Sequence, residues 1–171
     1  MRKLISAWDS ALTARLRIAE RPGRLKNLAA VLAHSGDSWF WLFGLFLIWW
    51  LGSVSWRSRA LSLAVAVVLT AVLVLAMKFT IRRRRPEGEW GGIYRSTDPH
   101  SFPSGHAARA MVLAVVAIGV GPTWLAIVLF CWAPFVSLAR VAMGVHYFSD
   151  VLAGLILGAA IGLLFLLRPG F

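Results

Sequence analysis

Two histidines and an aspartate stand among basic residues in the second half of the sequence, at spacings that suit phosphate chemistry. His106 follows Pro103, Ser104 and Gly105 directly ahead of a long apolar run. Ser104 can cap the helix that follows, and Gly105 lets an anion approach the backbone closely. The first amides of a helix attract an oxyanion, so His106 would sit beside a bound phosphate with a proton to give. The alternative interpretation is a plain helix cap beside an interfacial histidine.

The second histidine, His146, lies four residues before Asp150 in the segment RVAMGVHYFSD that begins at Arg140. In a helix these two side chains would share one face. A carboxylate bonded to one ring nitrogen fixes the tautomer and leaves the other nitrogen basic, as a nucleophilic histidine requires. The alternative is a structural His–Asp pair.

Lys78, Arg85 and Arg140 supply cations for the same site. Lys78 and Arg85 are seven positions apart in KFTIRRRRP, about two helical turns, and could share one side of a helix end. The intervening Arg82–Arg84 are explained adequately as cations that snorkel to lipid phosphates. The histidines and aspartate could instead bind zinc, but converging cations repel a divalent metal and attract an oxyanion. We therefore expect no metal and no cofactor, with the cations neutralising the phosphoryl charge.

The composition predicts an all-α, polytopic membrane helical bundle. Hydrophobic residues make up 59% of the 171 positions, and the mean hydropathy is +0.74. Uncharged segments close to the roughly 20 residues of a transmembrane helix occupy 39–56, 61–77 and 151–167. The charge-free run 110–139 is broken by glycines and a proline at 119–122, which makes it two spans and gives about five in all. The net charge of +11 then indicates anionic lipid headgroups as partners, not nucleic acid.

We expect a single domain over 1–171, in which residues 1–37 precede a helical bundle at 38–171. Apolar residues recur at helical spacing near the N-terminus and predict an amphipathic helix in the membrane interface: Leu4, Ile5, Trp8, Leu12 and Leu16. No cleavable signal peptide is expected. In the last span, Gly154, Gly158 and Gly162 form a small-residue stripe for close helix packing, either within the bundle or across a homodimer.

The alternation of spans places every unusual polar segment on one membrane face. Residues 1–37, the loop 82–103 and the connection 142–150 share that face. Seven basic residues precede the first span, which by the positive-inside rule places this face of the cell membrane in the cytoplasm. On the same face Asp37 is expected to cap a helix, although it could touch the site, and His100 is expected to be a solvated loop residue.

The three motifs in this order resemble the signature of the type 2 phosphatidic acid phosphatase superfamily, which also includes vanadium haloperoxidases. They are Lys78-x6-Arg85-Pro86, then 103–106, then Arg140-x5-His146-x3-Asp150. The resemblance implies that His146 is the nucleophile that becomes a phosphohistidine, with Asp150 orienting it and His106 protonating the leaving oxygen. It implies that the phosphate is held by the remaining motif residues: Lys78, Arg85, Ser104, Gly105 and Arg140.

Two features depart from the family pattern. Ala139 stands where the third motif usually has serine, so a hydrogen bond from that serine is missing. The family often has six spans, and here the first is replaced by the amphipathic segment.

The resemblance and the residues together predict a metal-independent lipid phosphatase. Its substrate would be a lipid phosphate or diphosphate: a prenyl diphosphate such as undecaprenyl diphosphate, phosphatidic acid or phosphatidylglycerol phosphate. The alternative is a non-catalytic membrane protein that binds or transports anionic lipids with the same cations. The absence of a large soluble scaffold argues against a haloperoxidase.

Overall fold

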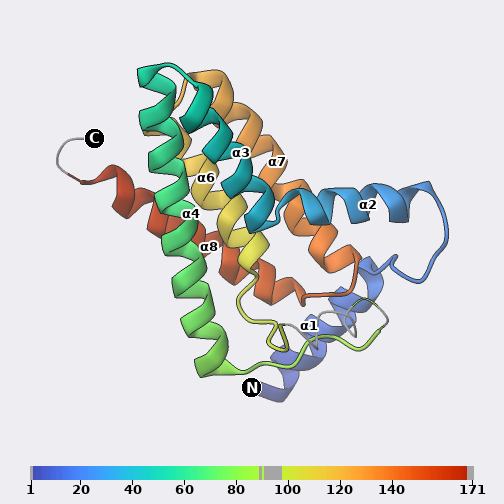
Figure 1. Ribbon diagram of the computed structural model, residues 1–171. Helices are drawn as coiled ribbons and strands as arrows, with labels where there is room; N and C mark the ends of the chain where they lie inside the picture. The colour runs from blue at the N-terminus through green and yellow to red at the C-terminus, as the bar shows by residue number, and fades with distance from the viewer. Residues whose placement is uncertain (1, 89, 91–97, 169–171) are drawn as a thin grey trace.

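The described part of the chain is built from helices. The computed structural model describes residues 2–88, 90 and 98–168, with only the backbone for 2–6. Within these ranges the chain forms no strand beyond an isolated bridge between Arg84 and His100. The helices, shown in Figure 1, are α1 (Arg2–Leu16), α2 (Arg24–Ser35), α3 (Ser38–Leu51), α4 (Val54–Ile81), α6 (Gly105–Val120), α7 (Thr123–Ala142) and α8 (Phe148–Leu166).

The structure confirms the predicted all-α membrane bundle and corrects where its spans begin and end. α4, α7 and α8 are each long and apolar enough to cross a bilayer, and α2 with α3 would make a fourth span bent by 57°. α6 is apolar but only 16 residues long. The five predicted spans overlap α3, α4, α6, α7 and α8, but in the described residues length and composition support three spans, or four if α2 and α3 form one.

The turn between the first two of these helices lies earlier than predicted. α3 ends at Leu51 and α4 starts at Val54, so the expected turn at 57–60 is helical. The physical reason is Arg57, whose guanidinium donates to the carbonyls of Gly52 at 3.0 Å and Trp50 at 3.3 Å. A charge in the first turn of α4 thus satisfies the exposed carbonyls that end α3.

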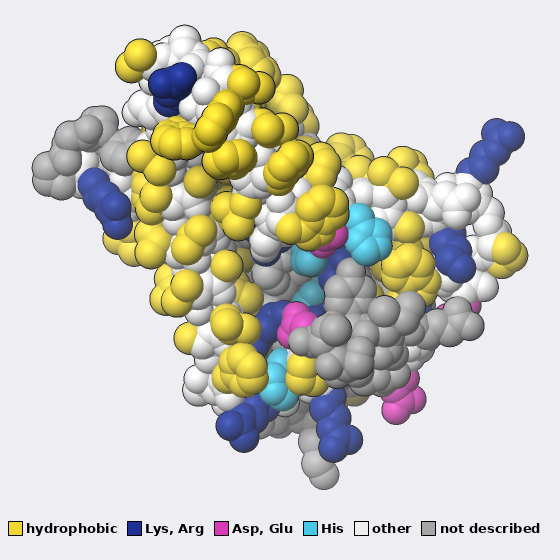
Figure 2. Space-filling model, viewed as in Figure 1, with side chains coloured by type: hydrophobic (Ala, Val, Ile, Leu, Met, Phe, Trp, Pro, Cys, Tyr) yellow, Lys and Arg dark blue, Asp and Glu magenta, His cyan; other side chains and the backbone are white. Residues whose placement is uncertain are grey.

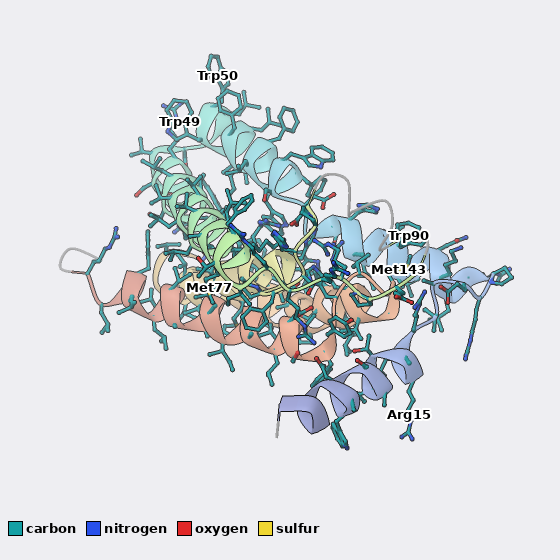
Figure 3. All side chains as sticks on the ribbon, turned by 90° about the horizontal axis from the view of Figure 1, so that it is seen from below. Arg15, Trp49, Trp50, Met77, Trp90 and Met143 are labelled. Atoms are coloured by element: carbon teal, nitrogen blue, oxygen red, sulfur yellow. The ribbon has the colours of Figure 1, made fainter. Side chains whose placement is uncertain are left out.

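α6 forms the centre of the bundle, and α4, α7 and α8 pack around it (Figure 1). Its small and β-branched side chains are buried along most of its length, and Val112, Leu113 and Val116 are fully buried in the main core. The surrounding helices turn large apolar side chains outward. Trp49 and Trp50, for example, project from the end of α3 (Figure 3). Such a surface suits lipid, because hydrocarbon chains replace the water that would disfavour it.

The glycine stripe of α8 lies against α6 inside the chain. A Cβ added at Gly154 or Gly158 would collide with the carbonyl oxygens of Ser104 or Ala108, and one at Gly162 would lie 2.7 Å from the Cβ of Val115. The stripe therefore serves close helix packing within the bundle, which was the first of its two predicted uses. A homodimer stays a prediction.

The N-terminal segment forms the expected helix, although the side chains of Leu4 and Ile5 lie outside the described residues. Trp8 is 75% exposed, as an interfacial side chain would be, and Arg15 also points away from the bundle (Figure 3). The opposite side of α1 docks by polar contacts at the start of α8. Asp9 accepts from the amide of Ser149 at 3.0 Å, and Thr13 accepts from that of Phe148 at 3.1 Å. The side chains of α1 thus satisfy amides that the start of α8 leaves unpaired.

Candidate active site

The three motifs converge at one end of the bundle, around a cavity of about 130 Å³. Figure 2 shows histidine, basic and acidic side chains gathered in a hollow beside the apolar surface of α4. The cavity is lined by Ala71, Val74, Leu75, Lys78, Asp98, Gly105, His106, Arg109, Arg140 and His146. A phosphate group fits in a space of this size.

His146 is buried and its ring is oriented by a backbone carbonyl. Its Nδ1 lies 2.8 Å from the carbonyl oxygen of Ser101, which can only accept, so Nδ1 carries the proton. Nε2 is left with its lone pair and lies 3.2 Å from Nη1 of Arg85. The basic nitrogen therefore faces a cation that can also bind phosphate.

The predicted hydrogen bond between His146 and Asp150 is not made. Nδ1 of His146 lies 3.7 Å from Oδ2 of Asp150, beyond hydrogen-bond distance but close enough for charge pairing. The expectation of a shared helix face was wrong because α8 begins only at Phe148. Asp150 instead accepts from the amide of Tyr147 at 2.9 Å and caps α8.

Arg83 is the main cationic partner of Asp150. The interpretation of Arg83 as a cation that snorkels to lipid phosphates was therefore wrong. Nη1 of Arg83 donates to Oδ1 of Asp150 and to Oγ of Ser149, each at 2.7 Å, and its Nη2 donates to Asp9 at 2.6 Å. Arg83 thus joins α1, the start of α8 and the site aspartate. The pKa of Asp9 is lowered overall, because hydrogen bonds from Ser149 and Arg83 outweigh the effect of its burial.

Lys78 and Arg85 meet through an acidic residue, not along one helix. α4 ends at Ile81, so Arg85 lies in the loop beyond the helix end. It donates from Nη2 to Oδ2 of Asp98 at 2.8 Å and from Nε to the Asp98 carbonyl at 2.7 Å. Lys78 pairs with the same carboxylate oxygen of Asp98. The carboxylate thus binds the two cations that were expected to hold phosphate oxygens.

The second motif starts α6 as expected but without the predicted cap. Ser104 is the residue before the helix, yet its side chain makes no capping hydrogen bond, and in the described chain its buried Oγ has no partner. Its amide donates to the carbonyl of Asp150 at 2.9 Å, which ties α6 to α8. Gly105 lines the cavity, so the backbone there is open to a ligand.

Asp37 contacts the site, contrary to its expected role as a helix cap. It stands at the N-cap position of α3 but makes no side-chain capping bond. Its Oδ1 lies 2.7 Å from Nε2 of His106, and its Oδ2 lies 3.2 Å from Nδ1 of His34.

Arg109 and Asp98 also line the cavity, although neither was predicted from the sequence. Arg109 is buried three residues after His106, lines the cavity and donates to the carbonyl of Gly36. An arginine inside an apolar helix was the available signal, because ionisable residues at membrane depth are generally functional. Asp98 had no comparable signal. Ala139, where serine was expected, is buried with Met143 and Val145 in a separate apolar cluster.

The electrostatics of the cavity favour an anion and a neutral nucleophile. Burial is the largest cause that lowers the pKa of His146 well below its ordinary value, followed by the charges of Arg85, Arg140 and Lys78. A neutral imidazole has the free lone pair that attack on phosphorus requires. Within the described ranges, no three His, Cys, Asp or Glu side chains are grouped to hold a metal ion. This arrangement can bind a phosphate between cations, with two histidines on the same cavity.

Comparison with known proteins identifies relatives of both the sequence and the fold. The model of the PAP2 superfamily matches residues 59–170. An undecaprenyl-diphosphatase of Sulfolobus acidocaldarius is 32% identical over 82% of this chain and 68% of its own length. A decaprenylphosphoryl-5-phosphoribose phosphatase of Mycobacterium tuberculosis is 33% identical over 85% of this chain and 80% of its own.

Two solved structures share the fold. The transmembrane PAP2-type phosphatidylglycerolphosphate phosphatase of Bacillus subtilis superposes with a TM-score of 0.77 at 24% identity, covering 95% of this chain and 84% of the other. LpxE of Aquifex aeolicus gives a TM-score of 0.72 at 24% identity, with 92% and 94% covered.

Proposed function

Since the chain belongs to the PAP2 superfamily, we propose that it is a membrane phosphatase that removes the terminal phosphate of a lipid phosphate or diphosphate without a metal. The observation that supports this most is the cavity in which the basic Nε2 of His146 lies 3.2 Å from Arg85, with His106 on the same wall. Relatives named as phosphatases of prenyl-linked substrates support the same conclusion.

The proposed reaction proceeds in two displacements. Nε2 of His146 attacks phosphorus, a P–N bond forms, and the P–O bond to the lipid breaks as His106 gives its proton to the leaving oxygen. His106 then takes a proton from water, whose oxygen attacks the phosphohistidine and releases inorganic phosphate. The site cations offset the charge on the phosphoryl oxygens throughout.

Each remaining site residue has a role that follows from its place. Lys78, Arg85 and Arg140, with the Gly105 backbone and Ser104, bind the phosphate, which must displace the carboxylate of Asp98 from the first two. Asp150, 3.7 Å from Nδ1, balances the positive charge that His146 acquires on phosphorylation. The carbonyl of Ser101 supplies the orientation that sequence reasoning assigned to Asp150.

The apolar part of the cavity wall supports a lipid as the substrate. Ala71, Val74 and Leu75 of α4 line it beside Lys78, and Leu75 is also exposed on the outer surface of the bundle. A lipid can therefore keep its tail in the bilayer while its phosphate reaches the cations. Prenyl diphosphates such as undecaprenyl diphosphate fit this description, as do phosphatidic acid and phosphatidylglycerol phosphate. By the positive-inside rule, the basic N-terminal segment supports a site on the cytoplasmic face of the cell membrane.

The test is phosphate release from a panel of these lipids by detergent-purified protein in EDTA. We expect turnover that vanadate inhibits, no turnover by His146→Ala, and normal turnover by His100→Ala. His100 is a suitable control because it packs on Phe79 and is not among the residues that line the cavity. A His146→Ala variant that still hydrolyses lipid would refute the mechanism. Lipid binding without turnover in every protein would favour the non-catalytic lipid-binding alternative.

A further inference from the structure

We propose that Asp37 is the positioning residue that holds His106 as the proton donor to the lipid leaving group. Asp37 and Gly36 form the elbow between α2 and α3. The inference rests on the proposed function and adds a residue to it. Asp37 lies outside the three sequence motifs and outside residues 59–170, which the family model matches. The proposal therefore gives a residue of the N-terminal third of the chain a part in the reaction.

Both carboxylate oxygens of Asp37 form hydrogen bonds with histidine side chains. An aspartate at an N-cap position ordinarily accepts from the first amides of its own helix. Asp37 makes no such bond, and its Oδ1 instead accepts from Nε2 of His106 at 2.7 Å, 69 positions along the chain. His34, one turn earlier, binds the other oxygen at 3.2 Å. Both oxygens are thereby fixed by rings and not by helix capping.

The backbone of the elbow holds the same edge of the His106 ring. A Cβ added at Gly36 would lie 3.1 Å from Cδ2 of His106 and 2.9 Å from Cγ1 of Val136, so only glycine lets the elbow approach this closely. The carbonyl of Gly36 accepts from Arg109, the next cavity residue along α6. Asp37 and Gly36 together therefore contact the Cδ2–Nε2 edge of the ring.

The hydrogen bond between Asp37 and Nε2 of His106 determines which ring nitrogen can act on the substrate. A carboxylate can only accept, so the proton of Nε2 stays in the bond to Asp37. Nδ1 is then the nitrogen left to exchange a proton with the leaving oxygen, and in the described chain it has no hydrogen-bond partner of its own. The carboxylate also stabilises the protonated ring that the first displacement requires.

The test compares leaving groups. An alkyl phosphate such as decyl phosphate needs a proton on its leaving oxygen, whereas the p-nitrophenolate of p-nitrophenyl phosphate leaves without one. General acid catalysis contributes about 10²–10⁴-fold, so we expect Asp37→Ala to lower kcat/KM for decyl phosphate by about 10–100-fold. The loss with p-nitrophenyl phosphate should be several times smaller. Asp37→Asn, which can still accept from Nε2, should recover part of the difference. Glu20→Gln is the control: this exposed side chain pairs with Arg17 and does not line the cavity, so its replacement should change neither value.

The ratio of the two kcat/KM values, measured in one preparation, does not depend on the fraction of folded protein. In a His106→Ala background, adding Asp37→Ala should leave this ratio unchanged. Equal losses on both substrates, including complete loss, would make Asp37 merely structural and overturn the inference, as would a wild-type ratio in Asp37→Ala. Turnover by His146→Ala would instead overturn the proposed function itself, so the two failures are distinguishable.

Discussion

Replacement of Arg83 by glutamine should destabilise the protein far more than the same replacement at Arg84. The two residues are adjacent in one basic run, and each change removes one positive charge. Arg83 bonds Asp150 and Asp9, whereas the side chain of Arg84 is exposed. Any general effect of charge on lipid or detergent binding is therefore shared by both variants, and only the contacts of Arg83 differ.

The magnitude follows from the burial of its partners. Asp150 is fully buried, Asp9 is 8% exposed, and the Arg83 side chain is 27% exposed. Breaking a buried ion pair costs about 3–5 kcal/mol. The partial exposure of Arg83, together with the amides that still donate to both carboxylates, reduces the expected loss to about 2–3 kcal/mol. For a chain of this length that corresponds to a Tm lower by about 5–10 °C.

The assay is thermal unfolding of detergent-purified wild type, Arg83→Gln and Arg84→Gln at one lipid and detergent concentration. We expect Arg84→Gln within about 2 °C of wild type, because exposed substitutions usually change stability by less than about 0.5 kcal/mol. Limited proteolysis should also release α1 first in Arg83→Gln, because the ion pair from Arg83 to Asp9 is lost and only the hydrogen bonds from the start of α8 still hold α1.

Equal Tm values for the two glutamine variants would refute this reasoning. They would show that the ion pairs of Arg83 contribute nothing net, and that the lipid-snorkelling interpretation of the basic run was adequate for Arg83 as well.

The three remaining predictions concern helix packing, the protonation of His146 and the binding of phosphate. Gly158→Ala should lower stability by about 1–3 kcal/mol in the same unfolding assay, since its Cβ meets a backbone carbonyl, whereas Gly44→Ala on the open face of α3 should not destabilise. In ¹⁵N-histidine spectra His146 should remain neutral at pH 5.5, because burial and cations lower its pKa, and a protonated ring at pH 6.5 would contradict this. Since the unfolded chain takes up that proton at about pH 6.5, stability should fall as the pH drops below this value. Asp98→Asn should strengthen inhibition by inorganic phosphate, because it removes the anion that competes for Arg85; unchanged inhibition would argue against that competition.

The class of the fold and the identities of the basic and histidine residues at the site could be read from the sequence. Hydropathy is a local property, so it located α7 and α8 within a few residues, whereas it started the span of α4 at residue 61 and not at Val54. It misplaced the end of α3, because Arg57 is satisfied by carbonyls that only the folded turn brings near. The spacing of Lys78 and Arg85 predicted that they share one side of a helix, whereas they meet through Asp98 because α4 ends between them.

The sequence by itself determined which side chains could do phosphate chemistry and that they lie at the ends of membrane helices. Only the tertiary structure decided their partners. His146 is oriented by Ser101, 45 positions away, Asp150 is paired with Arg83, 67 positions away, and His106 with Asp37, 69 positions away. A local pattern constrains neighbours within a turn or two of helix, whereas these hydrogen bonds depend on how α1, α3, α6 and α8 pack against one another.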